Sequence, residues 1–271
     1  MEQHLYVVTG GGSGIGEATV RDFRSASHQV IAMSRRSAPL EALAQETGCL
    51  FVAGDVAAPE DVERLRAVVD ATSLPLKGLV HAAGIMATGT VGETSLASWS
   101  TVLGVNLTGA FDVTRQLLPA LRAAGGSVVM VGSVAADRTP GGAAAYAVSK
   151  AALVALARCV AVEEGRGVRP VRCNVVNPGW TRSAMADAEM AEAMEVLGVE
   201  DVEAAYAAVS ALVPMGRPAF ANEVSSVITW LLSDGAGYVN GATVSVDGGH
   251  RLIDVGTVPF EFAVYARQSM D

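Results

Sequence analysis

The chain has 271 residues, of which 51% are hydrophobic and 17% are charged. This balance provides enough apolar side chains for one continuous core and excludes a disordered protein, which needs the reverse composition. The net charge of −9 argues against a nucleic-acid-binding protein, because such proteins need a basic face to displace counterions from phosphates.

Membrane insertion and secretion are also not expected. No apolar stretch reaches the ~20 uncharged residues that cross a bilayer, and Met1 to Tyr6 lack the basic and apolar regions of a signal sequence. Cys49, Cys159 and Cys173 are widely spaced, which predicts small buried hydrophobic residues and neither a disulfide framework nor a metal site. We therefore expect a cytoplasmic protein without nucleic-acid or membrane partners.

Short β-branched runs alternate with helix-length segments along the chain. Strands this apolar on both faces, separated by helices, indicate a parallel sheet that is covered by helices on each side. The expected fold class is α/β, a doubly wound Rossmann-type parallel sheet of about seven strands, in one domain over residues 1–271. The expected strands are residues 5–9, 29–33, 49–53, 77–81, 127–131, 172–176 and 243–246.

A glycine-rich segment from Thr9 to Gly16, Thr-Gly-Gly-Gly-Ser-Gly-Ile-Gly, follows the first strand and opens a helix. Glycines allow a tight turn and let a pyrophosphate approach the helix N-terminus, whose free N–H groups favour anions. The spacing differs from G-x-G-x-x-G, so a purely structural turn is the alternative for this segment taken alone. The dinucleotide-binding residues predicted here are Gly10, Ser13, Gly14, Ile15 and Gly16.

Tyr146 and Lys150 lie four residues apart in segment 143–164, a predicted long helix, so both side chains project from one face. The chain has 17 arginines but two lysines, and the two residue types differ in geometry and hydration, which disfavours a chance pairing on a solvated face. An adjacent ammonium stabilises a phenolate, so we expect Lys150 to lower the pKa of Tyr146. Ser133, just after the fifth strand, is expected to hold a carbonyl oxygen while Tyr146 protonates it.

Together these residues resemble the short-chain dehydrogenase/reductase family in its single-domain form of about 250 residues. Ser133 lies thirteen residues before Tyr146, at the position of the family's catalytic serine. The resemblance covers nearly the whole chain and implies hydride transfer between a nicotinamide dinucleotide and a small-molecule carbonyl or secondary alcohol, in a homotetramer or homodimer. It also implies that Asn106 holds a water in a proton relay to Lys150.

The resemblance extends to positions that bind the cofactor. Asp55, followed by Val56 after the third strand, resembles the acid that contacts adenine. Pro178-Gly179-Trp180-Thr181 resembles the turn that flanks the nicotinamide, with Thr181 at the carboxamide position.

One segment departs from the family pattern. His81-Ala82-Ala83-Gly84 stands where Asn-Asn-Ala-Gly is usual. It keeps Ala83 and Gly84 beside the cofactor but loses amide side chains that brace the sheet. We interpret His81 as a hydrogen-bonded structural residue and not as a general base.

Cofactor choice depends on the end of the second strand. In this fold an acid about 20 residues after the loop binds the ribose 2′-OH of NAD, whereas a nearby arginine accommodates the 2′-phosphate of NADP. Here Ser34, Arg35 and Arg36 follow Met33, and no acid occurs before Glu41. The sequence therefore favours NADP(H), with Arg35 and Arg36 on the phosphate. NAD(H) is the alternative, because the glycine loop carries Ser13 where many NADP-dependent relatives have a basic residue.

Segment 180–213 interrupts the alternation beside the carboxyl ends of the strands, where such sheets bind ligands, and we interpret it as a substrate lid. Trp180 and Met185 are expected to contact the substrate, and with Met190 and Met194 they could form a flexible apolar wall. Ordinary core packing is the more common role of methionines at helical spacing. A largely apolar ketone or its alcohol is the substrate expected.

Three other functions stay open. They are an NAD-dependent alcohol dehydrogenase, a 3-oxoacyl-carrier reductase and a non-catalytic dinucleotide-binding sensor. The carrier would dock on a basic rim formed by Arg138, Arg166, Arg169 and Arg182. A sensor needs the glycine loop alone, so the presence of Ser133, Tyr146 and Lys150 as well speaks against it.

Residues 250–271 form a C-terminal extension. Phe260, Phe262 and Tyr265 give it an apolar load that a free tail has little reason to expose. We expect it to pack on another subunit, with a frayed terminus as the alternative.

Overall fold

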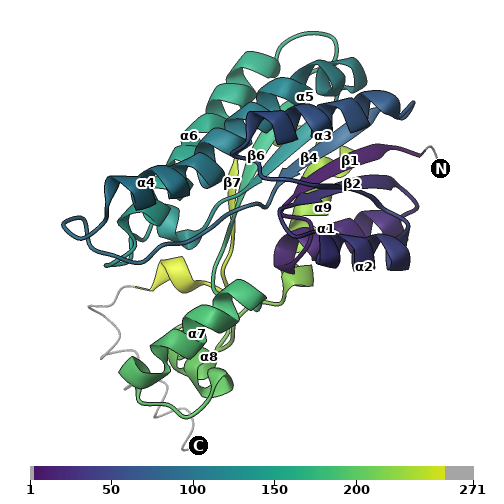
Figure 1. Cartoon of the computed structure of the whole chain (residues 1–271). Coiled ribbons are helices and arrows are strands. Elements are labelled where there is room, and N and C mark those ends of the chain that lie inside the picture. Colours follow the sequence, from purple (N-terminus) through teal and green to yellow (C-terminus); the bar gives the residue numbers. More distant parts are fainter. Residues whose placement is uncertain (1–2, 254–271) are drawn as a thin grey trace, which may run out of the picture.

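Seven parallel strands form one sheet at the centre of the computed structural model, which describes residues 3–253 (Figure 1). The strand order is β3-β2-β1-β4-β5-β6-β7, so the predicted doubly wound parallel sheet is confirmed. Each expected strand is present, and its ends differ by no more than two residues from the prediction. The bounds are Leu5–Thr9 (β1), Gln29–Ser34 (β2), Leu50–Ala53 (β3), Leu76–His81 (β4), Ser127–Val131 (β5), Arg172–Pro178 (β6) and Thr243–Val246 (β7).

Helices cover both faces of the sheet (Figure 1). One face carries α1 (Gly14–Ser25), α2 (Ser37–Thr47) and α9 (Ala221–Leu232), and the other carries α3 (Pro59–Ala71), α5 (Ala110–Ala124) and α6 (Ala144–Glu164). Each layer encloses its own cluster of buried side chains against the strands. The strands are apolar on both faces because each face meets one of these clusters.

α6 has 21 residues and is the one helix within residues 3–253 that is long and apolar enough to span a membrane by length and composition. The charged residues Lys150 and Arg158 interrupt its apolar sequence. Its residues Leu153 and Ala157 are buried in the core beside the sheet. A buried core helix can have the same composition as a membrane span. The packing of Leu153 and Ala157 shows that α6 is a core helix in this fold.

A continuous helical rod runs along the α6 side of the sheet. It consists of α4 (Leu96–Leu103), a π-helical turn (Gly104–Gly109) and α5. The Ser95 hydroxyl caps its start by accepting a hydrogen bond from the N–H of Ser98 at 3.1 Å. π-Helical turns inside α-helices often occur at functional positions, and this one carries Asn106.

Segment 180–213 contains α7 (Ala184–Leu197) and α8 (Val202–Ser210), which lie together beyond the carboxyl end of β6 (Figure 1). The two helices share a small core, in which Met190 is 2% exposed and Tyr206 is 1% exposed, with Met194 packed against it. Met190 and Met194 therefore have the ordinary core role and do not form a substrate wall, because both side chains stabilise the α7–α8 pair itself.

The C-terminal extension begins with a short 3₁₀ helix, His250–Leu252. The prediction that Phe260, Phe262 and Tyr265 pack on another subunit falls outside the described residues. Cys49 and Cys173 are buried as expected, but Cys159 is exposed. The pattern of small apolar residues in α6 did not distinguish its solvent-facing side from its core side.

Candidate active site

The glycine loop lies where the strand order reverses, beside the neighbouring ends of β1 and β4. Gly10 has φ +69°, and a Cβ there would lie 2.5 Å from the carbonyl carbon of Ala82. A Cβ on Gly16 would overlap the carbonyl oxygen of Gly10. The missing side chains let the loop pack directly on the segment after β4, which brings Ala83 and Gly84 to the same place.

The loop leads into the N-terminus of α1, where Ser13 is the N-cap residue but makes no capping hydrogen bond with its side chain. The N–H groups of Gly14, Ile15 and Gly16 have no acceptor within the helix, and the helix dipole there favours an anion. The residues present therefore fit the pyrophosphate of a dinucleotide.

Arg35 and Arg36 lie at the carboxyl end of β2, close to the glycine loop. A Cβ on Gly12 would lie 2.7 Å from the Ser34 hydroxyl. Both arginines are exposed, and neither side chain has a hydrogen-bond or ion-pair partner among residues 3–253. Arg36 is also the N-cap residue of α2, whose first turn holds no acidic residue. Two unpaired guanidinium groups thus lie beside the N-terminus of α2, and this environment favours an anion.

Asp55 and Val56 form the turn after β3. The Asp55 carboxylate accepts a hydrogen bond from the N–H of Ala57 at 2.9 Å. Val56 lies against the π-helical turn, because a Cβ on Gly109 would be 2.8 Å from Val56 Cγ2. Both residues therefore lie at the same edge of the sheet as the glycine loop, where the parallel strands end.

Ser133 follows β5 and is positioned by a residue that the sequence analysis missed. Its N–H donates a hydrogen bond to Asn177 Oδ1 at 3.1 Å, and its hydroxyl accepts one from the N–H of Ala135 at 3.1 Å. A Cβ on Gly132 would overlap Asn177 Oδ1, so glycine is required for this amide to reach across from β6. The available signal was a polar side chain near the carboxyl end of a strand, directly before Pro178.

Tyr146 and Lys150 occupy successive turns of α6. The Lys150 Nζ lies 5.5 Å from the centroid of the Tyr146 ring and donates a hydrogen bond to the carbonyl oxygen of Val131 at 2.8 Å. The Ser133 side chain lies close enough to Tyr146 to lower the pKa of the phenol. The structure therefore brings together the three residues that the sequence pattern selected.

Burial dominates the ionisation of this pair. It raises the pKa of Tyr146, the Glu189 carboxylate raises it further, and the hydrogen bond with Ser133 lowers it. Burial also lowers the pKa of Lys150 to about 8. The expectation of a lowered Tyr146 pKa is therefore wrong in its direction, because burial of the phenol outweighs the effect of Ser133.

Asn106 joins the π-helical turn to the segment after β4. Its Oδ1 accepts a hydrogen bond from the N–H of Ile85 at 2.8 Å, and its Nδ2 donates to the Ile85 carbonyl at 2.9 Å and to the Ser149 hydroxyl at 2.9 Å. A Cβ on Gly84 would lie 3.4 Å from Lys150 Nζ and 3.5 Å from Asn106 Oδ1. Asn106 and Lys150 thus flank the same glycine, and Ser149 is a second positioning residue that the sequence analysis missed.

The turn between β6 and α7 packs beside the glycine loop. Thr181 is buried and its hydroxyl donates a hydrogen bond to the carbonyl oxygen of Gly179 at 3.1 Å. Pro178 ends β6, and a Cβ on Gly179 would lie 3.0 Å from Asp247 Cα. Ser183, the N-cap residue of α7, lies over the glycine loop: a Cβ on Gly14 would be 3.2 Å from its Cβ.

The expected apolar wall contains a charged group. Trp180 packs against the α7–α8 core, and Met185 is 46% exposed. Glu189, one turn after Met185, is half-buried and its charge acts on Tyr146. Burial and the neighbouring Glu192 raise the pKa of Glu189. The sequence analysis missed Glu189 because the spacing of the methionines does not show which side of the helix faces Tyr146.

His81 has the structural role expected of it. Its Nε2 lies 2.8 Å from the Thr114 hydroxyl, and burial lowers the pKa of the imidazole to about 3. His81 is therefore neutral at physiological pH and bonded to α5.

The four arginines expected to form a docking rim do not assemble into one surface. Arg182 is paired with Glu203, and Arg138 donates to the Arg251 carbonyl. Arg169 lies near the amino ends of the strands, with its guanidinium on the Ala123 carbonyl at the end of α5. Their positions in the sequence did not show which arginines lie at the carboxyl edge of the sheet and which lie at the amino edge.

Comparison with known proteins gives consistent matches along the chain. Residues 10–251 match the sequence profile of a family described as enoyl-(acyl carrier protein) reductase. Protein MoaE of Klebsiella aerogenes is 35% identical over 269 residues, covering 94% of this chain and 98% of that protein. Galactitol 2-dehydrogenase (L-tagatose-forming) of Cereibacter sphaeroides is 34% identical over 251 residues, covering 90% and 94%. Actinorhodin polyketide ketoreductase with NADPH superimposes with a TM-score of 0.86 at 28% identity, covering 92% of this chain and 98% of that chain.

The lowered pKa of Lys150 gives a testable pH dependence of stability. The pKa falls from 10.5 to about 8 on folding, so the unfolded chain binds more protons between these two pH values, and the contribution of Lys150 to stability rises with pH across that window. Lys150→Met removes this contribution. Relative to the wild type, the variant should therefore be more stable near pH 7 than near pH 10, as measured by urea unfolding. An equal difference at both pH values would contradict the assignment.

Proposed function

This chain belongs to the short-chain dehydrogenase/reductase family, and on that premise we propose that it transfers a hydride between NADP(H) and a ketone or its secondary alcohol in the cytoplasm. Tyr146 donates the proton in reduction and accepts it in oxidation. The observation that carries the proposal is the convergence of Ser133, Tyr146 and buried Lys150 beside a glycine loop suited to a pyrophosphate.

Each residue of the site has one role in this proposal. The nicotinamide, when bound, supplies the hydride. Ser133, held by Asn177, orients the carbonyl oxygen, and Tyr146, which its raised pKa keeps in the protonated form, donates the proton to it. Lys150 returns the proton to Tyr146, and a lysine with a pKa of about 8 gains and releases protons near neutral pH. Asn106, which flanks Gly84 together with Lys150, holds a water of this proton relay.

The preference for NADP(H) rests on the surroundings of β2. Arg35 and Arg36 have no anionic partner in the described part of the chain, and the N-terminus of α2 opens beside them. A 2′-phosphate in this position would pair with the two guanidinium groups and would also interact favourably with the dipole at the N-terminus of α2. The structurally similar actinorhodin ketoreductase is described with NADPH, which supports the same choice.

A hydroxylated substrate is the second candidate, and Glu189 favours it over a plain apolar ketone. A half-buried carboxylate without a hydrogen-bond partner among residues 3–253 accepts a hydrogen bond from a hydroxyl group next to the reacting carbon. Galactitol 2-dehydrogenase, one of the similar proteins, acts by name on a polyol. We propose that segment 180–213 closes over the substrate and presents Glu189 to it.

The assignment of the proton donor is tested by Tyr146→Phe. Loss of the hydroxyl should lower kcat by about 10² to 10⁴-fold, the usual contribution of a positioned general acid, with NADPH binding preserved. Oxidation of NADPH in the presence of a panel of ketones measures kcat, and fluorescence titration measures cofactor binding. Tyr238→Phe, at an exposed tyrosine, is the matched control. Near wild-type turnover in Tyr146→Phe would refute the assignment, and a wild type that binds NADPH but turns over no substrate would indicate a sensor.

The cofactor preference is tested by Arg35→Ala. Loss of one charge-assisted hydrogen bond should weaken NADPH binding by about 10 to 150-fold and leave NADH binding nearly unchanged. Ser34→Asp should go further, because a carboxylate repels the phosphate and accepts a hydrogen bond from the ribose of NAD. Arg115→Ala, on α5 and paired with Asp112, serves as the control. A higher kcat/KM with NADH than with NADPH in the wild type would show that Arg35 and Arg36 are ordinary surface charges.

The role of Glu189 is tested by Glu189→Leu with paired substrates. If Glu189 binds a substrate hydroxyl, kcat/KM should fall by about tenfold or more for α-hydroxyketones and should not fall for the matching plain ketones. Glu195→Leu, at an exposed position of the same helix, is the control.

A pH profile checks the electrostatic effect separately. The Glu189 charge raises the pKa of Tyr146, so in Glu189→Gln the reductive activity should be lost at a lower pH than in the wild type. In the Glu189→Leu experiment, equal losses of kcat/KM for α-hydroxyketones and plain ketones would favour the apolar substrate.

A further inference from the structure

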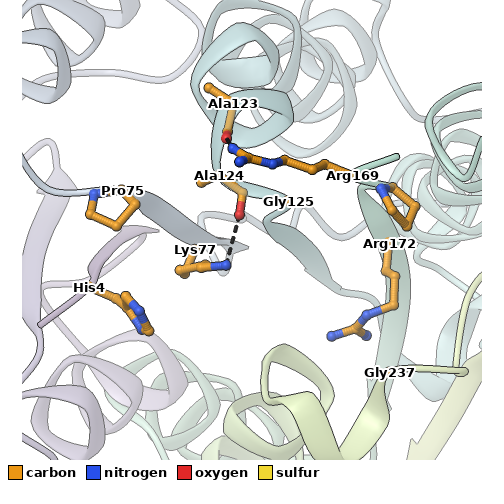
Figure 2. Close-up of a pocket in the computed structure, with 10 residues that line it drawn as sticks. His4, Pro75, Lys77, Ala123, Ala124, Gly125, Arg169, Arg172 and Gly237 are labelled. Atoms are coloured by element: carbon orange, nitrogen blue, oxygen red, sulfur yellow. Dashed lines mark hydrogen bonds between the residues drawn. The ribbon is translucent and has the colours of Figure 1, made fainter. Parts of the chain in front are cut away.

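A cavity of about 540 Å³ lies at the amino-terminal edge of the sheet, where β4 and β6 begin (Figure 2). It is lined by residues next to the starts of these strands and of β1, by the end of α5, and by Gly237. In a parallel sheet the glycine loop and Ser133 follow the opposite ends of the strands. This cavity is therefore separate from the proposed active site.

All the ionisable side chains that line the cavity are basic. Lys77, Arg169 and Arg172 contribute ammonium and guanidinium groups and His4 an imidazole, with no Asp or Glu among the lining residues that the structure describes. The chain as a whole carries a net charge of −9, and Lys77 is one of its two lysines. A cavity of this composition attracts anions, in contrast to the acidic remainder of the protein.

The three permanent cations are held in place by neutral groups. Lys77 Nζ donates to the Ala124 carbonyl at 2.7 Å, and Arg169 Nη1 donates to the Ala123 carbonyl, both at the end of α5 (Figure 2). Arg172 donates to the carbonyls of Leu231 at 2.8 Å and Ser233 at 3.1 Å, near the end of α9.

These bonds fix the side chains without neutralising them. Helix C-termini favour cations, which explains each basic residue singly. It does not explain why three of them border one hollow without a carboxylate ion pair among residues 3–253. An ammonium has three donors and a guanidinium five, so unused N–H groups remain for a ligand.

We propose that this cavity binds a small multivalent oxyanion, such as a phosphate or a polycarboxylate. Three fixed cations favour a multivalent anion over chloride, and the planar donors of arginine match carboxylate and phosphate oxygens. Burial lowers the pKa of Arg172, while Asp234 raises it, so an anion in the cavity stabilises a charge that has lost part of its water. The site is independent of the hydride-transfer proposal.

Isothermal titration of the full chain with citrate and, separately, with inorganic phosphate tests the site, in chloride buffers of equal ionic strength. We expect saturable binding of at least one of the two anions. Arg169→Gln and Lys77→Gln should each weaken it by about tenfold or more, the change that corresponds to one charge-assisted hydrogen bond. Arg66→Gln, at a paired and exposed arginine of α3, should not. Selection of phosphate over citrate identifies a phosphoryl ligand, and the reverse identifies a polycarboxylate.

Two results would overturn the proposal. One is the absence of binding beyond that of chloride, and the other is binding that Arg169→Gln leaves unchanged, which would place the anion at the glycine loop or on the general surface. Arg169 is exposed, so its substitution does not put folding at risk. Arg169→Glu, which reverses the charge, should abolish binding while leaving ketone reduction intact.

Discussion

The backbones of the glycine loop and of the segment after β4 pack against each other with no side chain between them, and the proposed active site depends on this contact. A Cβ on Gly10 would meet the backbone of Ala82, and backbone, unlike the end of a flexible side chain, cannot turn aside. Two residues later Gly84 lies against Lys150 and Asn106. The place suited to a pyrophosphate and the residues proposed to transfer protons are therefore built on one stretch of small residues. Their separation is set by covalent geometry and not by rotamers, so the distance between a pyrophosphate on the loop and the residues around Gly84 is fixed.

Desolvation is the second organising effect. It keeps the phenol of Tyr146 protonated, brings the pKa of Lys150 to about 8 and holds His81 neutral with a pKa of about 3. Ion pairs account for none of these shifts; the causes are burial, the hydrogen bond with Ser133 and the charge of Glu189. Burial favours the neutral form of each group, so it raises the pKa of the phenol and lowers the pKa of the ammonium and of the imidazole.

The amino-acid sequence was sufficient for the strands, the glycine loop and the trio of Ser133, Tyr146 and Lys150, because these depend on local periodicity and on fixed spacing. It was insufficient where the answer depends on which side of an element faces a neighbour. Met190 and Glu189 are adjacent in α7, yet Met190 belongs to the α7–α8 core whereas the charge of Glu189 acts on Tyr146. Asn177 and Arg169 show the same limit across greater distances: the first reaches Ser133 from another strand, and the second lies at the opposite edge of the sheet from the expected rim. The direction of the Tyr146 pKa also required the structure, since burial is a property of the folded chain.

The π-helical turn between α4 and α5 has a consequence for how this protein tolerates insertions and deletions. Each residue of an α-helix turns the chain by about 100°, and the wider turn at Gly104–Gly109 adjusts the phase between the helices on either side. With that adjustment, Asn106 faces Ile85 and Ser149 while Val113, Leu117 and Leu121 of α5 still face the sheet. Removal of one residue from the turn would restore a regular helix but would rotate one set of side chains away from its partners. Length is thus constrained within this rod independently of residue identity, so a single-codon deletion there should be more damaging than most substitutions at the same positions.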